Sequence, residues 1–371
     1  MIVFFAFLAV LVIYFAICKL YDKYWEHNLS VEIFLPDDEL YEGEKSSVVE
    51  VIVNDKFLPL PTLETRFYLD RRLRYIGDTK NSALSDMMYR RDAFTVGIKQ
   101  KISRSFDIIC TKRGYYTLDT LDLISSDLFL NKKFIGKRNF FKYFYVFPRK
   151  VESSKIAIPY RQICGELTVK KLLYEDPFSF AGIRDYTPTD TLNSINWKAS
   201  AKSQNLVVNT YESSIKQKVF VLLDTFNNEN MDYENLNEES IRISCAMMER
   251  LLMQGSEVTI VSNSVDALSQ KTLLLQDLNG IPINVLKQHL SRIKLGLETP
   301  LDTYISQIPH DSFVIVISKN TNLEQKLSAH FSSFYWIVPY KDEIPKFSLS
   351  RDKFYLWRLE SAIIFDDLGV F

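Results

Sequence analysis

"KVFVLLD", residues 218–224, is a continuous apolar run that ends in a carboxylate. A run of this kind is typical of a strand that is buried on both faces of a parallel sheet. Similar runs follow at residues 257–262 (EVTIVS), 311–318 (DSFVIVIS) and 333–340 (SFYWIVPY). We therefore predict that residues 216–371 carry the strands of one parallel sheet.

Helical patterns separate these strands. Between residues 238 and 254, apolar residues recur at three- and four-residue steps, and Gly255 stands where such a helix would end. The recurring residues are Ile241, Cys245, Met248 and Leu252. Further helices are expected around residues 284–294 and 322–331. Because strands that alternate with helices form right-handed βαβ units, the fold class predicted for residues 216–371 is a doubly wound α/β domain.

Residues 29–150 show the shorter period of β-strands. Stretches such as SSVVEVIV and YYTLDTLDLIS alternate apolar and polar residues, and no helical period intervenes. The chain also contains 26 Phe and 20 Tyr, whose side chains fit the half-buried surface of a sheet. These residues are predicted to form an Ig-like β-sandwich, with Val48, Glu50 and Ile52 as an example of the alternation.

The chain opens with an apolar segment at residues 2–18, which forms a helix of roughly 25 Å if it is continuous. No basic residue precedes this segment and no small-residue cleavage site clearly follows it, so an uncleaved transmembrane anchor is favoured over a signal peptide. Lys19 and Lys23 flank it on the C-terminal side, among aromatic residues. By the positive-inside rule, the body of a single-pass membrane protein with these flanks would then be cytoplasmic.

The composition argues against several classes of function. The 45 basic and 46 acidic side chains give a formal net charge of −1, so no global field favours nucleic acid. Two basic and aromatic clusters, at residues 71–75 and 137–144, are interpreted as solvated strand faces. No GxGxxG or Walker A sequence is present, and the scattered cysteines and histidines lack the spacing of a disulfide framework or a zinc site. We expect no cofactor and no nucleic-acid partner.

A polar, tryptophan-centred segment lies between the two predicted domains. It reads RDYTPTDTLNSINWKASAK at residues 184–202, within a longer stretch at 174–212. This stretch resembles the hallmark of bacterial membrane-anchored proteins encoded beside MoxR-type AAA+ ATPases, the domain-of-unknown-function family 58. The matching residues are Asp176, Pro177, Phe178, Arg184, Tyr186, Pro188, Asp190, Ile195, Trp197, Lys198, Ala199 and Lys202. The chain departs from many relatives at Thr189, Asn193 and Ser194, where a glycine and arginines are usual.

The resemblance implies the layout of the whole chain. It comprises an anchor at residues 1–24, the β-sandwich at 29–150, the signature segment at 151–215 and a domain similar to von Willebrand factor A at 216–371. It also implies a setting with a MoxR-type ATPase, in which the pair acts like a chaperone on the assembly or maturation of envelope or enzyme complexes.

Domains similar to von Willebrand factor A hold a divalent metal ion at the carboxyl ends of their strands, and Asp224 and Thr299 match two of the ligand positions. Phe226 and Asn228 stand in place of two serines, and Lys319 lies close to the position of an expected Asp. Because the donor set is reduced and a cation is nearby, no tightly bound metal is expected.

The leading hypothesis is therefore a membrane-anchored interaction protein that is not an enzyme. Within the signature segment, Arg184 can pair bidentately with Asp185, with Asp190 or with a partner's carboxylate. Trp197 suits either an internal clasp against the α/β domain, which we favour, or a docking surface. The alternative function is a metal-dependent hydrolase or binding enzyme that uses Asp224, Asp190 and Glu175 in a cleft between domains.

Overall fold

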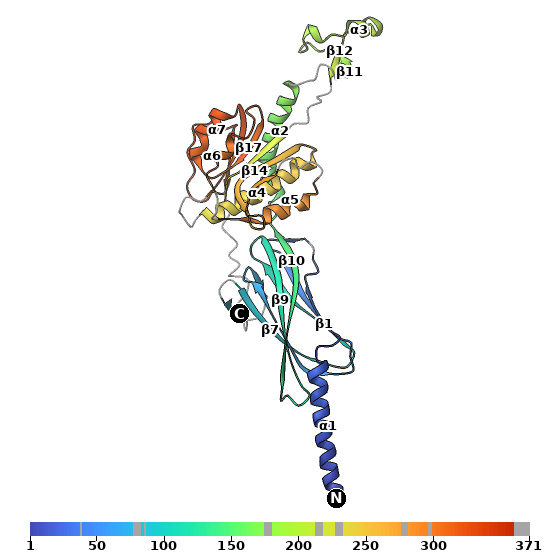
Figure 1. Cartoon of the computed structure of the whole chain (residues 1–371). Helices are drawn as coiled ribbons and strands as arrows, with labels where there is room; N and C mark the ends of the chain where they lie inside the picture. Colours follow the sequence, from blue (N-terminus) through green and yellow to red (C-terminus); the bar gives the residue numbers. More distant parts are fainter. Residues whose placement is uncertain are drawn as a thin grey trace. The chain divides into compact units, whose positions relative to one another are not determined.

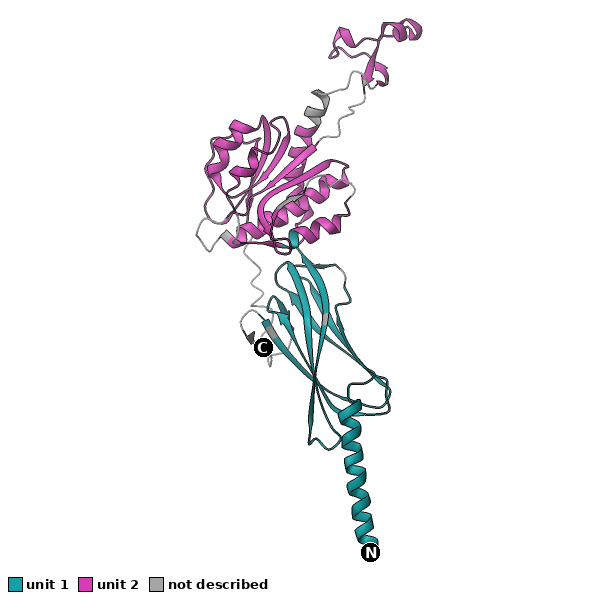
Figure 2. Cartoon of the chain, viewed as in Figure 1, with its two compact units in different colours: residues 1–149, 290–292, 363–371 teal, residues 150–289, 293–362 magenta. Residues whose placement is uncertain are grey.

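The structure, a computed structural model, describes residues 1–37, 39–76, 83–84, 87–173, 180–211, 218–226, 233–275, 281–295 and 299–359. The chain divides into two compact units close to residue 150 (Figure 2). The first unit is built mainly from residues 1–149 and the second from residue 150 onward.

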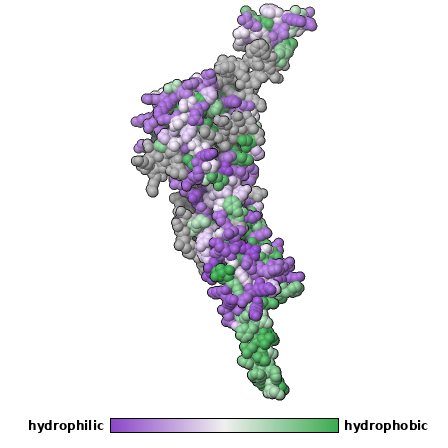
Figure 3. Space-filling view, viewed as in Figure 1, coloured by the Kyte–Doolittle hydropathy of each residue, from purple (hydrophilic) through white to green (hydrophobic). Residues whose placement is uncertain are grey.

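Helix α1 (Ile2–Tyr24) contains the whole of the predicted anchor. It is long and apolar enough to cross a membrane, and its apolar side chains are exposed over most of its length (Figure 3). Only its C-terminal end is buried against the strands of the first unit, at Tyr21 and the following Trp25. An exposed apolar helix therefore directly precedes a folded domain in the chain.

The rest of the first unit is a β-sandwich, as predicted. One sheet is antiparallel throughout, and the other is antiparallel except where β2 pairs with β10. In order, the first contains β1 (Leu29–Phe34), β3 (Lys45–Asn54), β8 (Gln100–Cys110) and β5 (Leu73–Tyr75). The second contains β2 (Leu40–Tyr41), β10 (Lys133–Phe147), β9 (Gly114–Ser126), β4 (Leu60–Asp70), β7 (Met87–Val96) and β6 (Ala83–Leu84).

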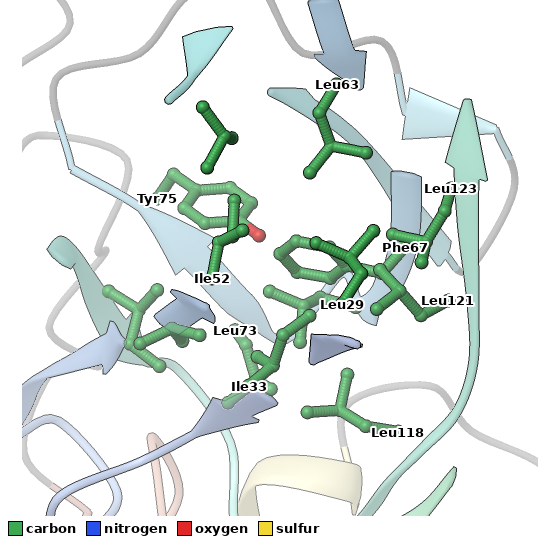
Figure 4. Packing of buried hydrophobic residues seen from close by; sticks show 14 of the residues in the cluster. Leu29, Ile33, Ile52, Leu63, Phe67, Leu73, Tyr75, Leu118, Leu121 and Leu123 are labelled. Carbon is green, nitrogen blue, oxygen red and sulfur yellow. The ribbon is translucent and has the colours of Figure 1, made fainter. Parts of the chain in front are cut away.

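Apolar side chains from both sheets fill the space between them. Leu29, Ile33 and Ile52 from one sheet approach Phe67 and Leu121 from the other (Figure 4). Each strand contributes every second residue to this core, because successive side chains of a strand point to opposite faces. The period-two pattern in the sequence thus arises because one face of each strand lies in the core of the sandwich.

One detail of the predicted alternation is wrong. Val48, Glu50 and Ile52 all lie on the inward face of β3, so Glu50 is a buried acid and not the polar partner of its apolar neighbours. The reason is that residues two apart on a strand share a face. The solvent side of this strand is formed instead by the residues between them.

The second unit contains a mostly parallel sheet. Its strand order is β15–β14–β13–β17–β18–β19, and β16 also pairs with β14. The parallel strands are β14 (Glu257–Asp266), β13 (Lys218–Leu223), β17 (Phe313–Ile317), β18 (Ser333–Tyr340) and β19 (Phe354–Arg358). The antiparallel strands are β15 (Thr272–Leu275) and β16 (Ile293–Lys294). The four apolar runs in the sequence form β13, β14, β17 and β18, and β19 is an additional parallel strand.

Helices cover this sheet on both sides. Figure 1 shows α6 (Asp302–Ile305) and α7 (Glu324–His330) on one side, with α4 (Tyr233–Met253) and α5 (Ile283–Ser291) on the other. The helices α4 and α5 correspond to predicted ones, and α7, preceded by a 3-10 turn at Thr321–Leu323, corresponds to the third.

The helix α2 (Ser153–Leu173) was not expected, because its residues fell within the predicted connecting segment at 151–215. It buries Ile156 and Ile163, and it belongs to the second unit. The Tyr160 hydroxyl donates to the side-chain oxygen of Gln254 at 2.6 Å, and Arg250 donates to the carbonyl of Ser153 at 3.0 Å. These bonds connect α2 to α4 and the residues just after it.

Candidate functional site

Residues 180–211 of the signature segment form a small module with its own hydrogen-bond network. Strands β11 (Phe180–Asp185) and β12 (Val207–Tyr211) pair antiparallel, and between them lie a 3-10 turn (Leu192–Ser194) and helix α3 (Trp197–Ser203). The side chain of Asn196 caps α3 by accepting from the Ala199 amide at 2.9 Å. Its amide nitrogen donates to Asn209 on β12 at 2.7 Å, which fixes the start of the helix against the strand.

Arg184 and Asp190 form the electrostatic centre of this module. The two terminal nitrogens of Arg184 donate to the two carboxylate oxygens of Asp190, at 2.7 and 2.5 Å. The backbone amide and the hydroxyl of Thr187 donate to the same carboxylate at 2.8 and 2.9 Å. The bond from Arg184 and the Thr187 amide hold the pKa of the Asp190 carboxyl well below its usual range. The carboxylate bound by Arg184 is thus that of Asp190, and Arg184 also donates to the backbone carbonyl of Asp185 at 3.2 Å.

Several large apolar side chains are exposed on the module, among polar and charged ones. The side chain of Trp197 is 66% exposed and that of Leu192 is 68% exposed, whereas Ile195 and Val208 are buried between the helix and the hairpin. Phe180, Ile183 and Leu206 are further exposed large apolar residues of the module. The internal clasp that we favoured would bury Trp197 against the α/β domain. Residues 174–179 and 212–217, which join the module to that domain, lie outside the described residues, so the clasp stays a prediction. The module is held together by Arg184, Asp190 and Asn196 without the tryptophan.

The remaining signature residues have different positions. Tyr186 is half-buried, and its backbone amide donates to the Leu206 carbonyl at 2.9 Å. Pro188, Lys198 and Lys202 are exposed. Asp176, Pro177 and Phe178 lie outside the described residues, as does Glu175, so the structure brings together only the later part of the predicted set.

Asp224 follows β13 at the carboxyl end of the parallel sheet and is only 1% exposed. One carboxylate oxygen accepts from the Asn263 side chain at 2.8 Å and from the Phe226 amide at 3.0 Å. The other accepts from the Ser318 hydroxyl at 2.6 Å. Both oxygens therefore have protein donors, as a buried carboxylate requires.

The side chain of Asn263 connects Asp224 to Thr299. Its amide nitrogen also donates to the Thr299 carbonyl at 2.9 Å, and its oxygen accepts from the Thr225 amide at 3.0 Å. The hydroxyl of Thr299 pairs instead with that of Tyr304 at 3.2 Å. The two predicted ligand positions are thus near each other, but the Thr299 hydroxyl is engaged elsewhere. Asn228 lies outside the described residues.

Lys319 lies at the same edge, as the sequence suggested. Its ammonium group donates to the Phe226 carbonyl at 2.7 Å and to the Asn237 side chain. A fixed cation so close to the carboxyl ends of β13 and β17 opposes the binding of a second cation there. Within the ranges that the structure describes, no group of three or more His, Cys, Asp or Glu side chains has the arrangement of a metal site.

Asn263 and Ser318 were not among the site residues predicted from the sequence. Both follow or end apolar runs, at SNS (262–264) and ISK (317–319), so their position next to a strand end was visible. Their contact with Asp224 depends on the order of the strands, because β14 and β17 flank β13 on its two sides. That order is not written in any local stretch of the sequence.

A second missed cluster lies inside the β-sandwich. Arg90 donates to Asp92 at 2.6 and 3.2 Å, and its guanidinium lies over the rings of Tyr75 and Phe106 at 4.7 and 4.0 Å. Glu50 is also buried here. Burial, followed by the charge of Asp92, raises the pKa of Glu50 to about 7, against the opposing effect of the nearby arginines.

Neither carboxylate of the alternative hydrolase that the structure describes is poised for chemistry. Asp190 is occupied by Arg184 and Thr187, and Asp224 by Asn263, Ser318 and the Phe226 amide. A general base or a nucleophile needs an accessible lone pair and a pKa suited to its task. The geometry therefore favours structural roles for both residues.

Comparison with known proteins gives little further guidance. No family model matches the chain. An uncharacterized protein of Bacillus subtilis, YeaD, is 26% identical over 82 residues, which are 22% of this chain and 19% of that protein. The chain therefore matches about a fifth of the length of this curated relative.

Among solved structures, three that are similar each cover about a third of this chain. A non-cellulosomal cohesin from Archaeoglobus fulgidus covers 32% of this chain and 91% of its own at 12% identity, with a TM-score of 0.22. A CARDB domain from Pyrococcus furiosus covers 30% and 90% at 16% identity, with a TM-score of 0.20. The major pilin SpaD from Corynebacterium diphtheriae covers 31% and 34% at 12% identity, with a TM-score of 0.23. Likeness at this level assigns no function to the chain.

Proposed function

We propose that this chain is a membrane-anchored protein-interaction factor that works with a MoxR-type AAA+ ATPase in the assembly or maturation of protein complexes. In this proposal α1 is the anchor, and the body of the protein is cytoplasmic in a bacterial cell. The module at residues 180–211 is the docking surface for the ATPase. The α/β unit is a von Willebrand factor A-like domain that acts without a metal ion.

The topology of the second unit supports the last point. Numbered along the chain without the short β16, its strands have the order 3-2-1-4-5-6, with the third strand antiparallel at one edge. In open α/β sheets of this kind, ligands bind at the carboxyl ends of the strands, where Asp224 lies. Here Asn263, Ser318 and Lys319 fill the space around that edge with internal hydrogen bonds.

The observation that carries the docking proposal is the exposure of Trp197 on a preorganised module. Tryptophan is strongly enriched among residues that dominate interface energies, and the side chain of Trp197 is 66% exposed. Because Arg184, Asp190 and Asn196 already fix the module, little conformational entropy would be lost when a partner covers it. Leu192 provides a second exposed apolar side chain.

A binding experiment tests the proposal. Full-length protein in detergent is titrated with a MoxR-type ATPase from the same cell, with ATP present, and binding is followed by the fluorescence anisotropy of the labelled ATPase. Trp197→Ala should weaken binding roughly 30-fold, which corresponds to an interface residue worth about 2 kcal/mol. The control is Ile344→Ala, which truncates an exposed apolar residue elsewhere and should bind normally. Equal affinity of Trp197→Ala and the unmodified protein would exclude this module as the docking surface.

A further inference from the structure

The tip of the β9–β10 hairpin lies alongside α1. The ring of Phe129 packs against that of Tyr14 with 4.8 Å between centroids, and the Asn131 side chain donates to the Tyr14 hydroxyl at 3.0 Å. Nearer the sandwich, Lys132 pairs with Asp22 at 2.5 Å. In Figure 1 the hairpin extends past the point where α1 enters the sandwich. The hairpin therefore follows the helix for more than two turns.

Several buried contacts fix α1 to the sandwich, so this arrangement is not a loose approach. The Tyr21 hydroxyl donates to the Pro59 carbonyl at 2.7 Å, and the ring of Trp25 stacks on that of Phe134 at 5.8 Å. Ile17 packs against the same hydrophobic core. With the last two turns of α1 held in this way, the level of the hairpin tip along the helix is set by the fold.

That level lies inside the apolar part of α1. The first charged residue after the apolar segment is Lys19, five residues beyond Tyr14. At about 1.5 Å per residue, the Tyr14 ring is about 7 Å from Lys19 along the helix axis. Apolar groups of proteins that lie in a membrane interface are buried about 5–10 Å into the headgroup and acyl boundary. If Lys19 marks the headgroups, Phe129 reaches the acyl chains.

The hairpin tip has the composition that such a position requires. Leu128, Phe129 and Leu130 are consecutive exposed apolar residues, and Leu130 is 62% exposed. The turn is preformed, because the buried carboxylate of Asp127 accepts from the backbone amide of Asn131 at 2.8 Å. Leu130 has a φ of 59°, a backbone conformation that is costly for a leucine. While they face water, exposed apolar side chains on such a loop contribute little to the stability of the protein.

We propose that Leu128, Phe129 and Leu130 insert into the membrane beside α1, as a second contact with the lipid acyl chains. The proposal rests on the membrane anchoring of α1 proposed above. Lys133 follows the tip and is exposed, so it lies at the level of the lipid phosphates and can bind anionic headgroups, whereas Lys132 pairs with Asp22. Two contacts hold the sandwich at a fixed tilt to the bilayer, where a single helix would let it rotate.

Depth-dependent fluorescence quenching tests this inference on the full-length protein. The background carries Cys18→Ser and Cys164→Ser, while Cys110 and Cys245 remain because burial raises the pKa of both thiols to about 12 and protects them from labelling. Single cysteines at Leu128, Val12 and Phe141 each receive an environment-sensitive dye. The protein is reconstituted into vesicles of phosphatidylcholine and phosphatidylglycerol whose acyl chains bear nitroxides at a shallow or a deep position.

The three sites have distinct expected results. The dye at Val12, in the exposed part of α1, should be quenched most by deep nitroxides, and the dye at Leu128 by shallow ones. The dye at Phe141, a more exposed site on the same hairpin (68% against 47% for Leu128) but thirteen residues further along the chain, should be quenched by neither. Quenching at Val12 with none at Leu128 would overturn the insertion of the hairpin while leaving the anchor intact.

Two other outcomes are also decisive. No quenching at either Val12 or Leu128 would overturn the anchoring of α1 and the inference with it. A blue-shifted but unquenched dye at Leu128 would mean that protein, such as a second copy of the chain, covers the tip. As a check that needs no substitution, photoreactive lipids should crosslink to the peptide containing Phe129 in the unmodified protein, and failure to do so would count against insertion.

Discussion

Arg184 binds both carboxylate oxygens of Asp190 across the turn that joins β11 to the 3-10 helix, at 2.7 and 2.5 Å. This pair closes the module on which Trp197 is exposed, and the Thr187 amide donates to the same carboxylate. Arginine is specific here because its planar group matches both oxygens at once, which a lysine cannot do.

The first prediction concerns the titration of this pair. Since the folded pKa of Asp190 is lowered, its ionised form is stabilised by the fold, and the stabilisation is present above the usual pKa and lost as the pH falls through the lower folded value. The carboxyl carbon of Asp190, followed by NMR, should therefore titrate well below pH 3.8. In Arg184→Lys the midpoint should move up toward the usual value, because the bidentate contact is lost. Identical titration in the two proteins would contradict the pairing.

The second prediction concerns the stability of variants at Trp197. Because its side chain is exposed, Trp197→Ala should change the free energy of unfolding by less than about 0.5 kcal/mol. The comparison is Trp336→Ala, which empties a fully buried site and should cost about 3–5 kcal/mol. Chemical denaturation followed by fluorescence measures both. A large loss for Trp197→Ala would support the internal clasp.

The third prediction concerns Asp224 and metal ions. Asp224→Ala removes the acceptor for Asn263, Ser318 and the Phe226 amide, so it should destabilise the α/β unit by about 3 kcal/mol. Asp224→Asn keeps the shape and one acceptor, and should cost less. Neither EDTA nor added Mg²⁺ should change the melting temperature of the unmodified protein. A rise with Mg²⁺ that disappears in Asp224→Asn would show that a metal ion displaces these bonds.

The fourth prediction tests the attachment of α1 to the sandwich. A Cβ on Gly136 would lie 2.9 Å from the ring of Trp25, which is stacked on Phe134 and cannot easily move. Gly136→Ala should therefore destabilise the first unit by about 1–3 kcal/mol. Gly165→Ala is the matched control, because a Cβ there meets nothing within 4 Å and alanine favours the helix α2. A neutral effect of Gly136→Ala would mean that the end of α1 moves freely.

The strands could be predicted from the sequence, but the contacts between them could not. Apolar runs marked β13, β14, β17 and β18 because strands buried on both faces leave no room for polar residues. The helix α2 was missed, and Pro159 within it is a residue that argues against a helix interior. In the signature segment, the short elements are stabilised by side chains such as Asn196 and Asp190, not by an apolar period.

The candidate sites show the same limit. The chemistry of Arg184 and Asp190 could be predicted because the two residues are close in the sequence, and the structure selects Asp190 over Asp185. The contact of Asn263 with Asp224 could not, because it joins two strands whose neighbourhood is set by the whole sheet. The exposure of Trp197 also could not be predicted, because the residues next to a tryptophan in the sequence do not show whether its side chain is buried or exposed.

The fifth prediction concerns Glu50, whose pKa is raised from 4.5 to about 7 by burial in the sandwich. The folded state holds the proton more tightly than the unfolded chain, so its contribution to stability is fully present below pH 4.5 and is lost as the pH rises through 7. A difference of this size corresponds to about 3 kcal/mol in the free energy of unfolding.

Glu50→Gln should remove this loss, because the amide fills the same space without a charge. Between pH 5 and 8, the free energy of unfolding of the variant should fall less than that of the unmodified protein, by about 3 kcal/mol. The variant should therefore be the more stable of the two at pH 8. Glu32→Gln, on the exposed face of the neighbouring strand β1, is the control and should follow the unmodified protein. Denaturant titrations at a series of pH values measure the difference. If Glu50→Gln and the unmodified protein lose stability in parallel as the pH rises, the arginines Arg90 and Arg104 keep Glu50 ionised in the folded sandwich, and the burial argument fails.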